Sequence, residues 1–305
     1  MSPKDYARQL ADEKKRLELL AGEDESVTAS ISLSYNLLDA ETQKHWRMLA
    51  VFPDTFDAPA AANVWEIKTD AVRDTLSRLL QFSMLEWNDS TKRYRLHDLM
   101  RAFARQRLTA HETDAAARRH ATHYGAALAT ADEFYKRGGD SLMIGLALFD
   151  LERGNIHAGQ AWAATHASKD GEAAELCRNY PGWGAFTLAL RQRPREQIRW
   201  LEAALAAARQ LRDLAAEGIH LGNLGLAHAR LGDYRRAVEF YENHLAIARE
   251  LGDRRGEGNA LGNLGVAHAN LGDHRRAIEH FQQLLEIACE LGDRREEGNA
   301  HGCLG

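Results

Sequence analysis

Side chains that could perform chemistry are present in this 305-residue chain, but they do not form the patterns that catalysis needs. Serine, histidine and aspartate all occur, yet there is no nucleophile-elbow GxSxG motif. His120 and His123 stand three residues apart on a predicted helix, but no cysteine or carboxylate completes a metal-ligand set. The three cysteines form no CxxC pair. We therefore expect neither an enzyme nor a metal site.

Amide side chains recur with a regular spacing in the C-terminal third of the chain. Because asparagine donates and accepts hydrogen bonds at once, it can bind the backbone of an extended peptide of varied sequence. The polar residues that lie away from the leucine and alanine stripes are predicted to bind a partner: Asn223, Arg230, Asn259, Asn263, Asn270 and Asn299. The alternative is that these side chains bond neighbouring helices or solvent.

The elements that carry these residues are repeated. Residues 222–261 and 262–301 align at a period of 40, a truncated copy starts at Gly302, and a degraded copy lies upstream of both. Within each unit, two runs of apolar residues at helical spacing end in Leu-Gly-Asp, where glycine suits the left-handed residue that closes a helix. Each unit is therefore predicted to be a helical hairpin, and the row of hairpins a solenoid.

Two glycines, Gly222 and Gly225, lie inside the first predicted helix of this hairpin. Each should cost about 1 kcal/mol relative to alanine. We expect a compensating close approach of the neighbouring helix.

The repeat resembles the tetratricopeptide repeat (TPR) in its longer form. The family pattern is met by Leu224-Gly225, Ala237 and Tyr241, and again one period later, while His228 and His268 stand where the family usually has tyrosine. This resemblance implies a right-handed α-solenoid over residues 171–305, with a concave face that binds a protein or peptide.

Residues 26–110 have a different pattern. Helices are predicted over 40–51, 56–65 and 70–80, followed by two short strands, 84–87 and 93–96, around a polar turn. A further helix, 99–108, can be capped by Asp98. Three helices followed by a β-hairpin describe a winged helix.

Three motifs in this region resemble the winged-helix region of NB-ARC signalling ATPases of the STAND class. They are Ser32–Leu38 for the family's "LSY..L", Met48–Pro53 for "L.vFP" and Tyr94–Leu99 for the "MHD" segment, and residues 5–13 look like the last helix of the preceding lid. The resemblance implies that His97 senses bound ADP in an intact parent protein.

The nucleotide-binding core of that family has no counterpart in the sequence. No Gly-Lys dipeptide occurs, so the GxxxxGK[ST] loop that cradles phosphates is absent. We therefore expect no cofactor in this chain, with ATP or ADP implied only for a full-length parent. The chain is interpreted as a fragment whose nucleotide-binding domain is missing.

DNA binding is the rival function for a winged helix. Positive charge gathers on the predicted wing and the helix after it, at Lys92, Arg93, Arg95, Arg101, Arg105 and Arg107. However, the net charge is −5, and the predicted recognition helix, 70–80, carries two aspartates beside its two arginines. We do not expect DNA as a partner. Nor do we expect a membrane, because the longest apolar stretch, Leu142–Phe149, is far shorter than the roughly 20 residues of a spanning helix.

The sequence thus predicts a mainly α protein in four parts. These are the end of a lid helix (1–25), a winged-helix domain with a small β-hairpin (26–110), a helical linker or degenerate repeat (111–170) and the TPR array (171–305). Within the third part, residues 142–167 are expected to form one more worn helical pair.

The predicted function is a non-catalytic, protein-binding regulatory segment of a STAND-type signalling ATPase. A cytoplasmic location is expected, because the cysteines form no disulfide framework and no signal peptide is recognised. A winged-helix transcriptional regulator and a passive TPR adaptor are the alternatives. The uncapped repeat at the C-terminus is expected to pair with another copy or to leave residues 292–305 disordered.

Overall fold

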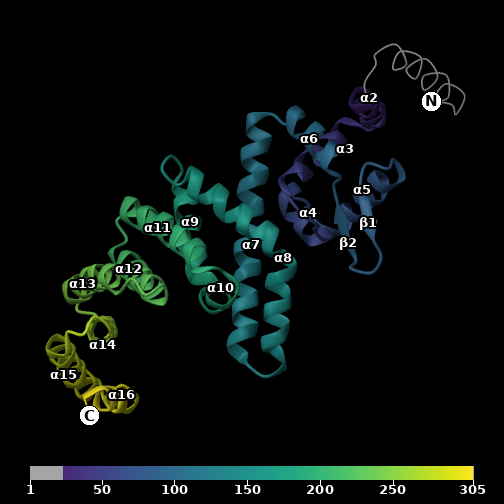
Figure 1. Cartoon of the computed structure of the whole chain (residues 1–305). Coiled ribbons are helices and arrows are strands. Elements are labelled where there is room, and N and C mark those ends of the chain that lie inside the picture. The colour runs from purple at the N-terminus through teal and green to yellow at the C-terminus, as the bar shows by residue number, and fades with distance from the viewer. Residues whose placement is uncertain (1–22, 305) are drawn as a thin grey trace, which may run out of the picture. The chain divides into compact units, whose positions relative to one another are not determined.

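The computed structural model describes residues 23–304, and most of them lie in helices (Figure 1). The predicted mainly α fold is confirmed, with one two-stranded sheet in the described part of the chain. The predicted lid helix over residues 5–13 lies outside the described residues. The chain divides into two units, one reaching Tyr124 and including Glu152–Gly159, the other formed by Gly125–Leu151 and Gln160–Gly305.

The first unit consists of short helices and one β-hairpin. Its elements are α2 (Glu23–Asn36), α3 (Ala40–Met48) with a 3₁₀ turn (Leu49–Val51), α4 (Ala58–Trp65), α5 (Thr69–Gln81), β1 (Glu86–Asn88), β2 (Arg93–Arg95), α6 (Asp98–Arg107) and the first half of α7 (Ala110–Arg137). The strands are antiparallel, with Trp87 opposite Tyr94. Three helices and a hairpin therefore follow one another as predicted.

Aspartates begin two of these helices. Asp39 accepts a hydrogen bond from the Thr42 backbone N–H at the start of α3, and Asp57 accepts one from Ala60 at the start of α4. The expected cap of α6 is wrong by one residue. His97 is the N-cap, while Asp98 is the first helical residue and pairs with Arg101 at 3.1 Å.

Aromatic side chains fill the core of the first unit. Phe52 and Phe56 stack with their ring centroids 4.2 Å apart, and Trp46 is fully buried with its indole N–H donating to the Met84 carbonyl. The backbone of Phe56 also exchanges two hydrogen bonds with that of Tyr94 in β2. The hairpin is thereby fixed to the helical core.

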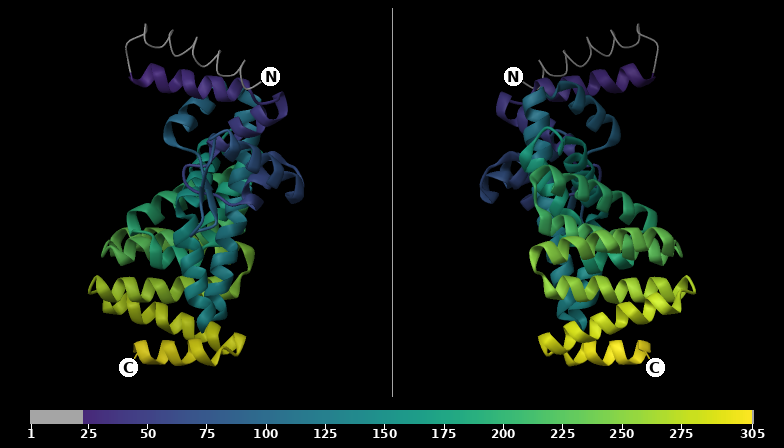
Figure 2. Two further views of the ribbon diagram at one scale, coloured as in Figure 1. Left: turned by 90° about the vertical axis from the view of Figure 1, so that its right-hand side faces the viewer. Right: turned by 90° about the vertical axis from the view of Figure 1, so that its left-hand side faces the viewer.

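The second unit consists of longer helices. After the end of α7 comes α8 (Asp140–His166), of which Glu152–Gly159 belongs to the first unit. The helices that follow are α9 (Gly171–Trp183), α10 (Ala185–Arg191), α11 (Pro194–Leu211), α12 (Leu214–Arg230), α13 (Tyr234–Leu251), α14 (Arg254–Asn270), α15 (His274–Leu291) and α16 (Arg294–Leu304). From α11 onward each helix contacts the next, and Figure 2 shows them as successive layers of antiparallel hairpins. Residues 294–304, for which disorder was one of two expectations, form α16.

One predicted pair of helices is a single helix. Residues 142–167, expected to form a hairpin, lie almost entirely within the 27-residue α8. Gly145 does not break this helix because it packs against the backbone of α7, where an added Cβ would lie 2.8 Å from the Tyr135 nitrogen. The expectation of two helices there is wrong, because the helix continues without a turn from Asp140 to His166.

The turns of the repeat follow the prediction. Gly232, Gly252, Gly272 and Gly292 all have positive φ, between 66° and 80°, in the region that favours glycine. The aspartates that come next cap the following helices; Asp253, for example, accepts from the Gly256 N–H at 2.9 Å. The Leu-Gly-Asp motif thus ends one helix and begins the next.

The expected close approach at the helical glycines is also confirmed. A Cβ added to Gly225 would lie 2.6 Å from Tyr241 Cδ1, and one added to Gly265 would lie 2.5 Å from Phe281 Cε1. Tyr241 and Phe281 are buried residues of the helices that follow. The glycines therefore let each pair of helices pack closely around an aromatic ring.

Candidate partner-binding groove

The first helix of each repeat, α12, α14 and α16, contributes side chains to one groove of about 710 Å³. This volume lies within the usual range of ligand sites. Four of the six residues predicted to bind a partner line it: Asn223, Asn259, Asn263 and Asn299. The repeat brings them together because Asn223 and Asn263, like Asn259 and Asn299, are 40 residues apart and so occupy equivalent positions.

The remaining two predicted residues lie elsewhere. Arg230 lines a smaller cavity that shares Asn223 and Leu226 with the groove. Asn270 is not among the lining residues, and its amide donates to the Val266 carbonyl one turn back in the same helix. Asn270 therefore bonds its own helix in this structure, and not a neighbouring one.

Three of the four groove amides have no hydrogen-bond partner in the described part of the chain. The side chains of Asn223, Asn259 and Asn263 make no hydrogen bond there, and Asn299 makes a long one of 3.3 Å to Glu296. Each amide offers one acceptor and two donors. The groove can therefore satisfy both the N–H and the C=O groups of an extended backbone.

Apolar side chains lie between these amides. Ile219, Leu226 and Val266 line the groove and are 59, 40 and 49% exposed. They were not among the residues predicted from the sequence to bind a partner, although Leu226 and Val266 occupy equivalent repeat positions. That repetition of an exposed apolar residue was the available signal. An occupant of the groove thus meets apolar contacts as well as amides.

Ion pairs join the helices behind the groove. The buried carboxylate of Glu257 accepts from Arg249 of α13 at 2.8 Å and from Arg254 of its own helix at 2.6 Å. Arg254 also pairs with Glu290 of α15. Burial raises the pKa of Glu257, but the hydrogen bonds from the two arginines outweigh it, and the pKa lies below its usual range. The groove helices are therefore held to one another by charge as well as by packing.

His97, the predicted ADP sensor, lies in the other unit. It is exposed, and its Nδ1 accepts from the Leu99 backbone N–H at 3.3 Å, which caps α6. The chain supplies no phosphate-binding loop beside it. The residues present do not fit a nucleotide, and we derive no step through one.

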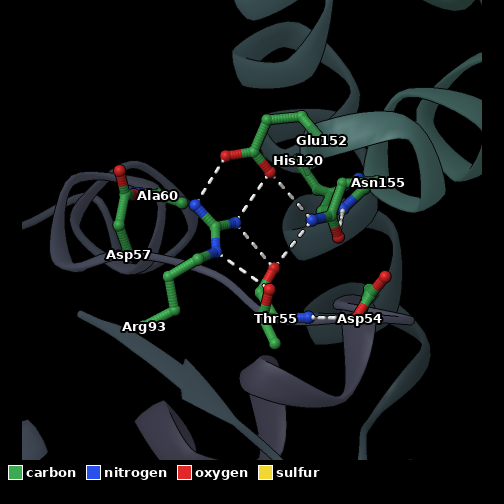
Figure 3. A network of polar contacts seen from close by, with 8 residues as sticks. All are labelled: Asp54, Thr55, Asp57, Ala60, Arg93, His120, Glu152 and Asn155. Atoms are coloured by element: carbon green, nitrogen blue, oxygen red, sulfur yellow. Dashed lines mark hydrogen bonds and ion pairs between the residues drawn. The ribbon is translucent and has the colours of Figure 1, made fainter. Parts of the chain in front are cut away.

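The arginine of the predicted wing anchors a buried polar cluster in the first unit (Figure 3). Arg93 makes two hydrogen bonds of 2.7 Å to the carboxylate of Glu152 in α8, and also donates to Thr55. The Thr55 carbonyl accepts from both Arg93 and Asn155, and Asn155 Oδ1 lies 3.4 Å from His120 Nε2. Burial raises the pKa of Glu152 and lowers that of His120 to about 4. This cluster joins β2 to α8 and leaves Arg93 unavailable to an outside phosphate.

The other cations proposed for DNA binding also contact their own chain. Lys92 pairs with Asp89, Arg95 and Arg101 with Asp98, Arg105 donates to the Ala50 carbonyl, and Arg107 lies over the Phe103 ring. Residues 23–304 also hold no cluster of three potential metal ligands, and no helix among them is long and apolar enough to cross a membrane.

Comparison with known proteins finds a known repeat in the residues that line most of the groove. Residues 217–290 match the family model of the tetratricopeptide repeat. The chain is 35% identical over 152 residues to the regulatory protein AfsR of Streptomyces coelicolor, and 36% identical over 101 residues to that of Streptomyces griseus. These matches cover 46 and 32% of this chain but only 15 and 10% of the two relatives.

A similar solved structure is a STAND protein with a tetratricopeptide repeat sensor from Pyrococcus horikoshii. It is 14% identical with a TM-score of 0.40, and the match covers 88% of this chain and 54% of that one. The TPR domain of Arabidopsis FLU matches 44% of this chain at 23% identity and a TM-score of 0.33.

Proposed function

We propose that this chain is a non-catalytic regulatory segment that binds an extended peptide of a protein partner in the groove of its tetratricopeptide repeats. The observation that carries this proposal is the convergence of Asn223, Asn259 and Asn263 on one groove without hydrogen-bond partners in the described residues. Solvent-exposed residues such as Arg235 and Arg275 also recur at equivalent positions, so the shared groove and the missing partners, and not the recurrence, favour a ligand. Peptide backbone is the ligand that suits them, because it alternates donors and acceptors.

The regulatory part of the proposal rests on the relatives. AfsR is named a regulatory protein, and the motifs of residues 32–99 resemble the winged-helix region of STAND ATPases. In a parent protein of that kind, peptide capture by the repeats would favour one of two conformations through its differential affinity for them. The nucleotide, the role of His97 and the cytoplasmic setting belong to that proposed parent.

DNA binding is the weaker alternative. The basic side chains of the predicted wing contact the chain's own carboxylates, carbonyls and rings, and Arg93 is buried. A passive adaptor would use the same groove without a switching partner.

Peptide selection tests the proposal. Peptides selected from a random-sequence displayed library against the full chain should lose at least tenfold in affinity when Asn223 and Asn263 are both changed to alanine. The matched control is Asn243→Ala, because Asn243 is exposed on α13, where its amide bonds the Glu239 carbonyl of its own helix. Equal affinity of the double variant and the control would refute the groove as the binding site.

A further inference from the structure

A small cavity of about 70 Å³ adjoins the groove between α10, α11 and α12. Asn223 and Leu226 line both hollows, so the groove and the cavity adjoin at these two residues of α12. The other polar lining residues are Gln192, Gln197 and Arg230, and the apolar walls include Trp200 and Leu188. None of the groove's repeat units contains the element that closes the cavity, the seven-residue α10.

Gln192 is the unusual residue of this cavity. Its side chain is only 8% exposed, and neither Nε2 nor Oε1 has a hydrogen-bond partner in the described residues. Buried amides nearly always have partners, because a desolvated donor or acceptor left unpaired destabilises the fold. Gln192 therefore contributes to the lining of this cavity a buried donor and a buried acceptor, each with almost no accessible surface and without a partner in the described residues.

The position of Gln192 is fixed from two sides. Its backbone N–H donates to the Leu188 carbonyl at the end of α10. The start of α10 is held by Asp132 of α7, which is fully buried and accepts from the backbone N–H groups of Phe186 and Thr187 at 2.9 Å each. The amide is thus presented by a short helix that is secured at both ends, as a preorganised site requires.

The polar groups that line the cavity indicate which chemical group it can bind. A carboxylate only accepts hydrogen bonds, so it would leave Gln192 Oε1 unpaired and facing negative charge. A carboxamide donates and accepts at once, and it can pair with both atoms of the Gln192 amide. The volume has room for roughly two to five water-sized atoms, which suits the end of a side chain and excludes an aromatic ring.

Arg230 adds a preference for neutral ligands over cationic ones. It is exposed and forms no ion pair within residues 23–304, unlike Arg249, which pairs with Glu257. A lysine or arginine of the ligand would be repelled by this charge, whereas a carboxamide oxygen can accept a hydrogen bond from it.

We propose that this cavity binds the carboxamide of an asparagine or glutamine side chain in the peptide that occupies the groove. The inference rests on the proposed function, and it adds a side-chain preference to a groove that otherwise contacts backbone. Gln192 is the residue that sets this preference, with Asn223 and Arg230 as additional hydrogen-bonding groups.

Titration of the full chain with small probes tests the cavity without requiring a known peptide. The probes are N-acetyl-glutamine methylamide, its glutamate counterpart and its methionine counterpart, followed through the NMR signals of the Gln192 side-chain amide. The glutamine probe should shift these signals and bind about tenfold more tightly than the other two. Tighter binding of the glutamate probe would overturn the proposal in favour of a carboxylate site. Equal or absent binding would show that the cavity holds only water.

Two variants separate recognition from folding. Gln192→Leu removes the unpaired amide at nearly constant size, so the variant should stay folded and bind the glutamine and methionine probes equally. Arg255→Gln is the matched control for Arg230→Gln, because both arginines are exposed and line hollows, but only Arg230 lines this cavity. Only Arg230→Gln should lower the affinity for the glutamine probe. A preference for the glutamine probe that survives in Gln192→Leu would contradict the proposal.

The two proposals fail in distinguishable ways. Selected peptides that bind through Asn223 and Asn263 but show no asparagine or glutamine preference would refute the carboxamide site alone. Glutamine probes that bind at Gln192 in a chain that selects no peptide would refute the proposed function alone.

Discussion

At the scale of single residues, asparagines at equivalent repeat positions gather in one groove. Asn223 and Asn263 both line the groove, as do Asn259 and Asn299. All four were predicted from the sequence to bind a partner, and that binding stays a prediction. Asn270 was predicted with them, but it is the last residue of α14 and lies beyond the groove. The sequence shows that such a residue is polar and repeated, whereas its place along the helix decides whether it reaches the groove.

Gly225 offers a test of the packing between repeat helices. In Gly225→Ala the new methyl group would collide with the Tyr241 ring, so the gain in helix propensity should be outweighed and stability should fall by about 1–3 kcal/mol. Gly298→Ala is the control, because no atom lies within 4 Å of the added Cβ in α16, and it should stabilise by up to about 1 kcal/mol. Urea unfolding of the full chain measures both, and a stabilised Gly225→Ala would contradict the packing account.

Glu257 should make stability depend on pH. Its folded pKa lies below the ordinary value of 4.5, so its contribution is fully present above pH 4.5 and is lost as pH falls through the folded pKa. Glu257→Gln should therefore be less stable than the parent chain at pH 7, and the difference should shrink on acidification. Urea midpoints across pH 3–7 measure this, with the exposed Glu279→Gln as control. A difference that stays constant over that range would show that the carboxylate's ionisation is not involved.

At the scale of elements, local signals predicted hairpins and missed long-range polar contacts. Leu-Gly-Asp marks each turn because glycine adopts positive φ and aspartate caps the next helix, both of which are local properties. The pair Arg93–Glu152 spans 59 residues of sequence, and nothing near either residue indicates its partner. The position of Gln192 likewise depends on a contact distant in sequence, because Asp132 of α7 caps α10, the helix that Gln192 follows.

Removing one partner of the buried Arg93–Glu152 pair, which joins β2 to α8, should strongly destabilise the fold. Glu152→Ala leaves the Arg93 guanidinium buried without a counter-charge, so unfolding free energy should fall by about 3–5 kcal/mol. The double variant Arg93→Met/Glu152→Leu removes both charges and should recover most of that loss. Denaturant unfolding of the three proteins completes the comparison. If the double variant is as unstable as Glu152→Ala, the ion pair stabilises the fold by more than the cost of burying its two charges.

At the scale of the whole molecule, the chain combines a repeat array that presents a groove with a unit whose basic residues are engaged internally. The sequence predicted the mainly α fold because the 40-residue period and the helix stops are explicit in it. The match covers only 15% of the S. coelicolor regulator, so a regulatory output is proposed only for a longer parent protein. Peptide recognition, in contrast, can be tested on this chain itself.

The most direct test of the account is the NMR spectrum of the side-chain amides during titration of the full chain with a library-selected peptide. The account predicts that the signals of Asn223, Asn259 and Asn263 shift together and saturate with one dissociation constant, while those of Asn243 and Asn270, which bond their own helices, stay in place. A peptide that binds while the three groove amides remain unchanged would contradict it.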